Sequence, residues 1–183
     1  MPRVKTPDEK ELLVLQAYAL IGHAASSFAT LEFQLQFLLG MLVSGKALSP
    51  EVAILMGNNT FAEKIRVLKE MAILRIPKGS PLRDRMSKLV HQLNSLRNTR
   101  NKFIHGCWLV NYPLVLSTGG VTCSDPKCRF NEKEEEWRAM KSESISLKHL
   151  ETTSHAIRHA IDEIHAITGE LERGLKQRKT QTH

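Results

Sequence analysis

Three long stretches of the chain carry apolar residues at alternating spacings of three and four, which is typical of helices with one face in a core. They span residues 9 to about 43, 82 to 105 and 147 to about 175. A further helix is predicted over 60–76. Together these four helices and their short connections predict an all-α protein, an up-and-down four-helix bundle. In the third helix the apolar series is Leu82, Met86, Leu89, Leu93 and Leu96.

Polar residues that favour helix starts mark the predicted boundaries. Thr60 and Glu63 have the spacing of a capping box, in which each side chain bonds the other residue's backbone amide. Ser49 and Ser80 each precede a proline, which suits the first position of a helix, and Ser49 predicts a short helix over 50–56. Ser146 is the expected cap of the last helix, and the polar end of the chain, 176–183, is expected to fray.

The pattern changes between the third and the last helix. Residues 107–118 are rich in strand-forming side chains, and two glycines at 119–120 indicate a turn before 121–123. We expect a small antiparallel hairpin or three-stranded flap inserted at about 107–140, with 127–130 as a candidate further strand and a solvated acidic run at 132–136. The whole chain, residues 1–183, is predicted to be one helical domain that carries this insertion.

Positive charge is concentrated in the middle of the chain. Lysine and arginine number 26 against 19 aspartates and glutamates, a net charge of +7. Residues 60–105 contain eleven basic and three acidic side chains, so this segment alone accounts for the excess. A concentrated positive field favours a polyanion such as RNA or DNA. A solvated helical surface would have the same composition, so charge alone does not decide between the two.

The cysteines and the first residues indicate the compartment. Three cysteines in a chain whose start has no apolar leader favour free thiols in a reducing cytoplasm. Between Leu12 and Gly45 the only charged residue is Glu32. Polar side chains interrupt this stretch at helical spacing, whereas a membrane span needs about 20 consecutive apolar residues. We therefore expect no contact with a membrane.

An arginine occupies the next apolar position of the third helix. After Leu96 the series continues with Arg100 and Phe103. A buried, unpaired charge is costly, so Arg100 needs a carboxylate, an open cleft or an anion. At 100° per residue, four polar residues of this helix fall on one stripe beside it: Asn94, Arg97, Asn101 and His105.

This combination of residues suits RNA cleavage without a metal or cofactor. Histidine takes or gives a proton near neutral pH. Arginine stabilises a phosphate whose charge grows in the transition state. Arg100, His105 and Asn101 are therefore the catalytic candidates, and Arg97, Lys102, Asn94 and Glu32 are the candidates for binding or orienting. One histidine cannot act as acid and base at the same moment, and a two-fold dimer would supply the second.

At these residues the chain resembles the HEPN family (higher eukaryotes and prokaryotes nucleotide-binding), helical bundles with an Arg-Asn-x-x-x-His signature. Here the signature reads Arg100 to His105, and the Gly106-Cys107-Trp108 that follows looks like the common His-Gly-x-Trp continuation. Glu32 resembles the acidic position of the family's first helix, and Lys64 resembles the lysine of its second. The resemblance implies a ribonuclease site at a dimer interface, and membership of a toxin–antitoxin, phage-defence or RNA-processing system. An antitoxin protein would then be a partner.

Other functions remain open at this point. The polar stripe of the third helix and Arg100 can bind RNA, a nucleotide or a protein without catalysing a reaction. Arg100 can also pair with Glu32 simply to fix the bundle, while His105 caps its helix. Cys123 and Cys128 can offer two thiolates to zinc, but their spacing fits no standard module, so two free thiols are favoured. Side chains for which packing or solvation is favoured over a functional role are Trp108, Tyr112, His155 and His159.

Overall fold

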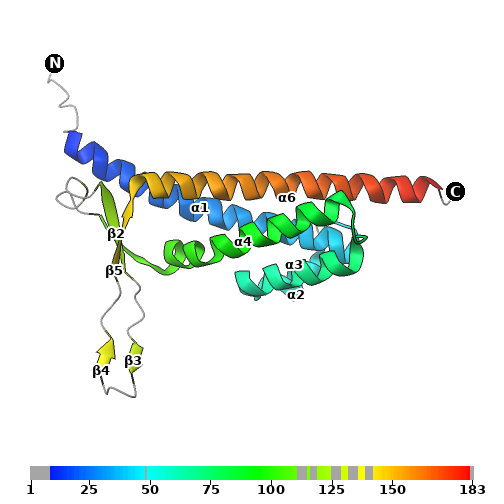
Figure 1. Ribbon diagram of the computed structural model, residues 1–183, viewed down its shortest axis with the longest axis horizontal. Helices are drawn as coiled ribbons and strands as arrows, with labels where there is room; N and C mark the ends of the chain where they lie inside the picture. The colour runs from blue at the N-terminus through cyan, green and yellow to red at the C-terminus, as the bar shows by residue number, and fades with distance from the viewer. Residues whose placement is uncertain are drawn as a thin grey trace. The chain divides into compact units, whose positions relative to one another are not determined.

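The chain is mostly helical, with a small antiparallel three-stranded sheet. The computed structural model describes residues 9–47, 49–110, 115, 119–124, 129–131, 136–138 and 142–181, with side chains from 11 to 177 within these ranges except at 129–131 and 136–138. The helices in Figure 1 are α1 (Glu9–Ser44), α2 (Pro50–Gly57), α3 (Phe61–Arg75), α4 (Pro81–His105) and α6 (Leu147–Gln181).

The predicted capping residues are confirmed. The Thr60 hydroxyl accepts a hydrogen bond from the Glu63 amide at 3.3 Å, and the Glu63 carboxylate accepts one from the Thr60 amide at 2.7 Å. These backbone and side-chain bonds from Thr60 hold the pKa of the Glu63 carboxyl below its ordinary value. Ser49 caps α2, and the Ser146 hydroxyl accepts from the His149 amide at 3.1 Å in the first turn of α6.

The predicted apolar series is buried in α1 and, except for the half-buried Leu82, in α4. In α4 the side chains of Met86, Leu89, Leu93 and Leu96 are buried, and Phe103 is buried beyond them. Buried residues of α1 recur at the predicted heptad spacing: Ala17, Ile21, Ala24, Phe28, Leu31, Leu35, Leu38 and Leu42. Periodicity therefore identified the core-facing side of both helices, because a helix that packs on one side must repeat its apolar residues with its turn.

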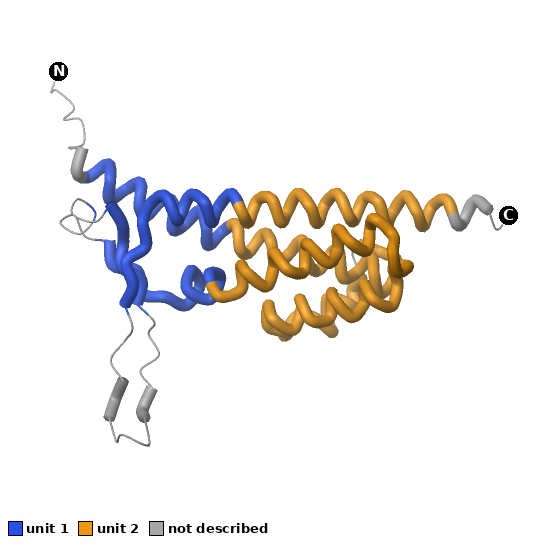
Figure 2. Tube along the Cα trace, in the orientation of Figure 1, with its two compact units in different colours: residues 1–26, 99–155 blue, residues 27–98, 156–183 orange. Residues whose placement is uncertain are grey.

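The chain forms two compact units (Figure 2). Unit 1 comprises residues 1–26 and 99–155, which include the start of α1, the end of α4, the sheet and the start of α6. Unit 2 comprises residues 27–98 and 156–183, with α2, α3 and the remaining parts of α1, α4 and α6. The single domain over 1–183 stays a prediction.

The predicted flap is a three-stranded antiparallel sheet in the order β1-β2-β5. Its strands are β1 (Cys107–Leu109), β2 (Gly120–Ser124) and β5 (Ser142–Ser146). The insertion thus extends beyond the predicted end at 140. β5 contains a single apolar residue, Ile145, so it has no clear strand pattern of its own and is defined by pairing with β2.

A second, two-stranded sheet pairs β3 (Arg129–Asn131) with β4 (Glu136–Arg138). The candidate strand at 127–130 overlaps β3, but it pairs with β4 and not with the three-stranded sheet. Of the acidic run at 132–136, residues 132–135 lie outside the described residues, and Glu136 begins β4.

Helix α6 continues to Gln181, beyond the predicted end near residue 175, so the expected fraying from 176 is not what the structure has. Residues 176–181 are lysine, glutamine, arginine and threonine, without a glycine or proline to break the helix. Helix α1 raises a separate question, because Glu11–Ser44 is long and apolar enough to cross a membrane by length and composition, with a mean hydropathy of 1.4. The absence of membrane contact therefore stays a prediction.

Candidate functional site: the C-terminal turn of α4

The glycine that follows the last turn of α4 allows the three-stranded sheet to pack closely against that turn. The Gly106 amide donates to the Lys102 carbonyl at 2.7 Å and closes the helix. A Cβ atom at position 106 would clash with that carbonyl and would lie 2.5 Å from the Cys123 sulfur of β2. Only glycine lets the strand approach the helix this closely, which explains why a glycine directly follows the histidine.

Three predicted catalytic residues lie together in this turn. One guanidinium nitrogen of Arg100, Nη1, is 3.3 Å from the Asn101 side-chain oxygen and 3.3 Å from Nε2 of His105. A guanidinium only donates hydrogen bonds, so Nε2 must be the acceptor and the neutral ring carries its proton on Nδ1. Arg100 therefore contacts the nitrogen lone pair that a general base would use.

The turn opens to solvent on its polar side. Asn101 and His105 are exposed and Arg100 is half-buried, whereas Leu96 and Phe103 are buried. The predicted position of Arg100 in the apolar series is thus correct, and the guanidinium meets the polar side through its contacts with Asn101 and His105. The contact between the guanidinium and the imidazole is exposed to solvent.

The inner face of the sheet closes the opposite side of the turn. The Trp108 ring lies 4.9 Å from the Phe103 ring, and Trp108 stands opposite Cys123 in the β1–β2 register. The Cys123 thiol is 3.9 Å from the Lys102 carbonyl. Packing of Trp108 in the protein, which the sequence favoured over base stacking, is therefore confirmed. Its indole Nε1 is buried and has no hydrogen-bond partner in the described part of the chain.

Lys102 connects the helix to the sheet. Its ammonium forms an ion pair with Glu143 of β5, and both side chains are about half exposed. Sequence reasoning missed Glu143, because no local signal indicates which strand residue will lie beside a helix 41 positions earlier. Lys102 was expected to bind or orient, and in this structure it anchors β5 next to the site.

Asn94, Arg97 and Glu32 belong to unit 2. Asn94 and Arg97 are exposed on α4, and the Asn94 amide donates to the Val90 carbonyl at 3.0 Å. Glu32 lies 3.8 Å from the ammonium of Lys64, a buried lysine. The two positions matched to the HEPN pattern outside the motif thus pair with each other, while the suggested Arg100–Glu32 pair stays a prediction.

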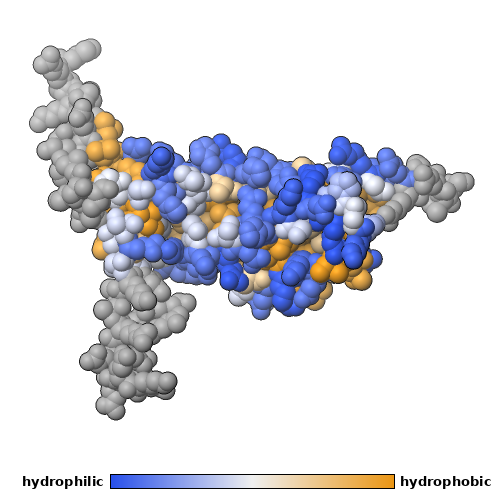
Figure 3. All heavy atoms as spheres, in the orientation of Figure 1, coloured by the Kyte–Doolittle hydropathy of each residue, from blue (hydrophilic) through white to orange (hydrophobic). Residues whose placement is uncertain are grey.

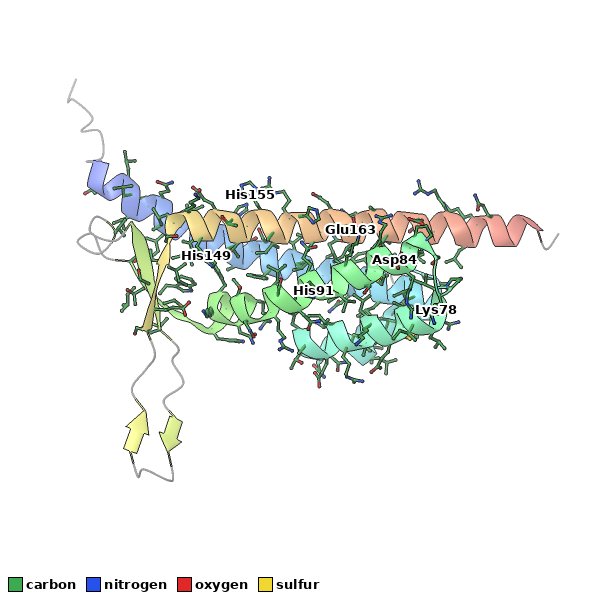
Figure 4. All side chains as sticks on the ribbon, in the orientation of Figure 1. Lys78, Asp84, His91, His149, His155 and Glu163 are labelled. Carbon is green, nitrogen blue, oxygen red and sulfur yellow. The ribbon has the colours of Figure 1, made fainter. Side chains whose placement is uncertain are left out.

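Unit 2 holds most of the positive charge. Its residues include fifteen basic and nine acidic side chains, a net charge of +6, against eleven and ten in unit 1, a net charge of +1. Some of these cations have structural roles: Arg85 of α4 bonds Glu163 at 2.9 Å and Glu170 at 2.8 Å on α6 (Glu163 is labelled in Figure 4). Other basic side chains are exposed, including Lys69, Lys88 and Arg97.

Within the described part of the chain, no three His, Cys, Asp or Glu side chains are grouped so that they could hold a metal ion. The cysteines and the histidines of α6 therefore form no metal-binding cluster there. The Cys107 side chain is exposed and the Cys123 side chain is buried, while Cys128 lies outside the described residues, as does Tyr112. His155, labelled in Figure 4, and His159 are both exposed on α6, as expected for a solvated face.

Comparison with family models, with curated proteins and with solved structures finds no match for this chain. Function is therefore inferred from the chemistry of the α4 turn and from the distribution of charge.

Proposed function

We propose that the protein is a metal-independent endoribonuclease of the HEPN type, with its site at the C-terminal turn of α4. The observation that supports it most is the 3.3 Å contact between Arg100 and His105 on the open side of the turn. It joins a fixed positive charge to a titratable base, the two groups that phosphodiester cleavage needs most. The up-and-down four-helix bundle and the resemblance at Arg100–Trp108 belong to the same proposal.

In the proposed reaction Nε2 of His105 removes the proton from a ribose 2′-hydroxyl. The 2′-oxygen attacks the adjacent phosphorus, and the bond to the 5′-oxygen of the next nucleotide breaks. Arg100 moves from His105 to the non-bridging phosphate oxygens, where its charge stabilises the pentacoordinate phosphorus. Asn101 orients Arg100. The products are a 2′,3′-cyclic phosphate and a 5′-hydroxyl, and no cofactor takes part.

The leaving 5′-oxygen must gain a proton while His105 already holds one. A second copy of the chain would supply a second histidine as the acid, so the proposed enzyme is a homodimer. The exposed cations of unit 2 would hold the RNA backbone. A cytoplasmic toxin or phage-defence enzyme restrained by an antitoxin protein fits this activity.

The test is cleavage of RNA by purified protein in EDTA. Wild type is expected to cut and to leave cyclic phosphate ends, and His105→Ala and Arg100→Ala are each expected to lose at least about 100-fold in rate while keeping their helical circular dichroism. His155→Ala, which removes an exposed histidine of α6, is the matched control and should cut normally. Undiminished cleavage by His105→Ala would disprove the proposal.

A second function, a non-catalytic module that binds RNA, a nucleotide or a partner protein, is favoured by one observation. Arg100 already occupies the His105 lone pair that catalysis would use. In that case wild type would bind RNA without cutting it, and the alanine variants at 100 and 105 would still bind. If Arg100 is purely structural, Arg100→Met should leave the protein as stable or more stable.

A further inference from the structure

Unit 2 contains a cavity of about 690 Å³ beside the last turns of α1 and α3, the start of α4 and the C-terminal part of α6. Every residue that lines it belongs to this unit. Hydrophobic atoms reach the surface at the right-hand end of unit 2 in Figure 3. Cavities of roughly 300–1,000 Å³ accept small organic ligands, so the size of this one permits a ligand.

The core-facing series of α6 is uncovered at this cavity. Before the cavity the series is fully buried at spacings of three and four: Ile157, Ala160, Ile164 and Ile167. The next two positions are Leu171, which is half-buried, and Gly174, where an added Cβ atom would meet no atom of the described residues within 4 Å. A helix face that packs in the core over several turns is expected to be covered at its next turn as well. An apolar body in the cavity would cover it.

An arginine occupies the next core-facing position of α3. The buried apolar residues of that helix recur at spacings of four and three: Phe61, Ile65, Leu68 and Ala72. Arg75 follows three residues later and lines the cavity. Its guanidinium lies 3.5 Å from the Val43 carbonyl at the end of α1, and no carboxylate of the described residues pairs with it. A guanidinium carries five N–H donors in a planar fork that matches a carboxylate, so Arg75 can hold an anionic head group at the cavity.

The charges around the cavity favour an anion. Carbonyls at the ends of α1 and α3 carry partial negative charge, but Arg75 donates to one at the end of α1 and Arg83 donates to two at the end of α3. Among the described lining residues the one carboxylate is Glu170, which bonds Arg85 at 2.8 Å. Arg173 also lines the cavity. Arginines thus outnumber carboxylates there, and the charge of Glu170 is already neutralised by its partner.

The lining also indicates which anion fits. None of its described side chains is aromatic, so a nucleobase would find no ring to stack on. Met41, Leu42 and Leu175 can adapt their shape to a flexible alkyl chain. The Glu170 carboxylate in the lining favours a head group with one negative charge over a phosphate monoester, which carries about −1.5 to −2. A single carboxylate on an aliphatic chain meets all three conditions.

We propose that this cavity binds a linear aliphatic carboxylate, a fatty acid, with its chain along Leu171 and Gly174 and its head group on Arg75. The site uses unit 2 alone and does not depend on the proposed ribonuclease, because Arg100 and His105 belong to unit 1. His105→Ala is therefore expected to bind the ligand as wild type does.

The main experiment is isothermal titration calorimetry of the full chain with decanoate. Wild type is expected to bind one decanoate per chain, at least about tenfold more tightly than decan-1-ol, which has the same chain without the charge. Decyl phosphate is expected to bind more weakly than decanoate, and AMP is not expected to displace it. Decanoate that does not saturate at one per chain, or that binds no more tightly than decan-1-ol, would overturn the proposal. Tighter binding of decyl phosphate, or displacement by AMP, would overturn the carboxylate as the ligand.

Arg75→Gln tests the contact with the head group. It is expected to weaken decanoate binding at least about tenfold and to leave decan-1-ol binding unchanged, because only the charged contact is lost. Arg66→Gln is the matched control, since Arg66 is an exposed arginine of the same helix that bonds Glu70 and lies outside the lining. It should bind decanoate like wild type. An equal loss in both variants would mean that net charge attracts the ligand, and would overturn the assignment to Arg75.

Gly174→Trp tests the cavity itself. The indole is expected to occupy the space, to weaken binding of both decanoate and decan-1-ol at least about tenfold, and to remove the rise in thermal unfolding midpoint that decanoate gives wild type. Its helical circular dichroism should be unchanged. Gly169→Trp is the matched control, since Gly169 lies on the same helix, is equally open to an added Cβ atom and is outside the lining. Undiminished decanoate binding by Gly174→Trp would place the ligand elsewhere on the protein and overturn the site.

Discussion

Gly106 sets how closely the sheet approaches His105. The missing Cβ leaves room for the Lys102 carbonyl and the Cys123 sulfur, so β2 packs directly on the last turn of α4. A residue without a side chain thus shapes the site as much as the polar residues do. The sequence showed that a glycine ends the helix, but the reason for it is a contact with a strand 17 positions later.

Gly106→Ala is expected to lower the free energy of unfolding by about 1–3 kcal/mol, because the new methyl group meets a backbone carbonyl that cannot move aside. Chemical denaturation followed by circular dichroism measures it. Gly169→Ala is the matched control, since nothing lies within 4 Å of the Cβ it would add in α6. It should raise stability by about 0.5–1 kcal/mol. Equal effects of both changes would contradict the close contact at Gly106.

Arg100→Lys is expected to slow RNA cleavage by about 10- to 100-fold and to leave RNA affinity nearly unchanged. Lysine keeps the positive charge but lacks the planar guanidinium, whose Nη1 contacts both Asn101 and His105 here and whose other nitrogens can bind phosphate oxygens in a bidentate way. Single-turnover cleavage and filter binding separate the two quantities. Arg97→Lys, which changes an exposed arginine one turn earlier, serves as the control and should cut at the wild-type rate. A full rate with Arg100→Lys would mean that Arg100 supplies charge only.

At the scale of elements, the helix starts were predictable because their signals are local. Thr60 and Glu63 are three residues apart, and the bonds between them need no other part of the chain. Strand β5 was missed for the opposite reason. Its five residues contain one apolar side chain, and its pairing with β2 depends on residues about 20 positions earlier. Helix α6 extends beyond its predicted end near residue 175 because the residues after its last apolar position also favour helix.

Thr60→Ala is expected to destabilise the protein by about 1 kcal/mol at neutral pH, because the capping box at the start of α3 is lost. The folded pKa of Glu63 is depressed, so its contribution is present above the ordinary carboxyl pKa and is lost as pH falls through the lowered value. The difference between wild type and Thr60→Ala should therefore become smaller in acid, where only the bond from the Glu63 amide to the Thr60 hydroxyl still distinguishes them. Urea unfolding at neutral and at acid pH measures this. Thr152→Ala in the interior of α6 is the control, and it should change the free energy of unfolding little at either pH.

At the scale of the whole molecule, charge is divided between the two units. Unit 2 contributes six of the seven net positive charges, and unit 1 contains the motif turn and the sheet. A polyanion that binds the exposed cations of unit 2 would thus be attracted by a different part of the chain from the part that holds His105. Salt dependence of RNA binding is the property that reports on this division.

RNA affinity is expected to fall as salt rises. Removing Lys88 and Arg97 together should reduce the slope of log affinity against log salt by about 0.7 for each cation. Lys148→Ala removes an exposed cation of unit 1 and should leave the slope unchanged. Fluorescence anisotropy with a labelled single-stranded RNA, titrated at several salt concentrations, measures all three proteins. If Lys148→Ala reduced the slope by the same amount per cation, RNA binding would depend on net charge and not on the position of the cations.

The sequence by itself determined the helices, their caps, the buried series of α1 and α4, the basic middle segment and the three residues of the α4 turn. All of these are readable because each depends on residues within a few turns of one another. Arg100, Asn101 and His105 lie together for that reason, because they fall within about one and a half turns of the same helix.

Only the tertiary structure decided which distant residues meet. It paired Lys102 with Glu143, brought Cys123 to the Lys102 carbonyl and joined Glu32 to Lys64. It also left the other side of α1 exposed at Leu12 and Leu15. Periodicity reports that a helix face is apolar. What covers that face depends on the rest of the chain.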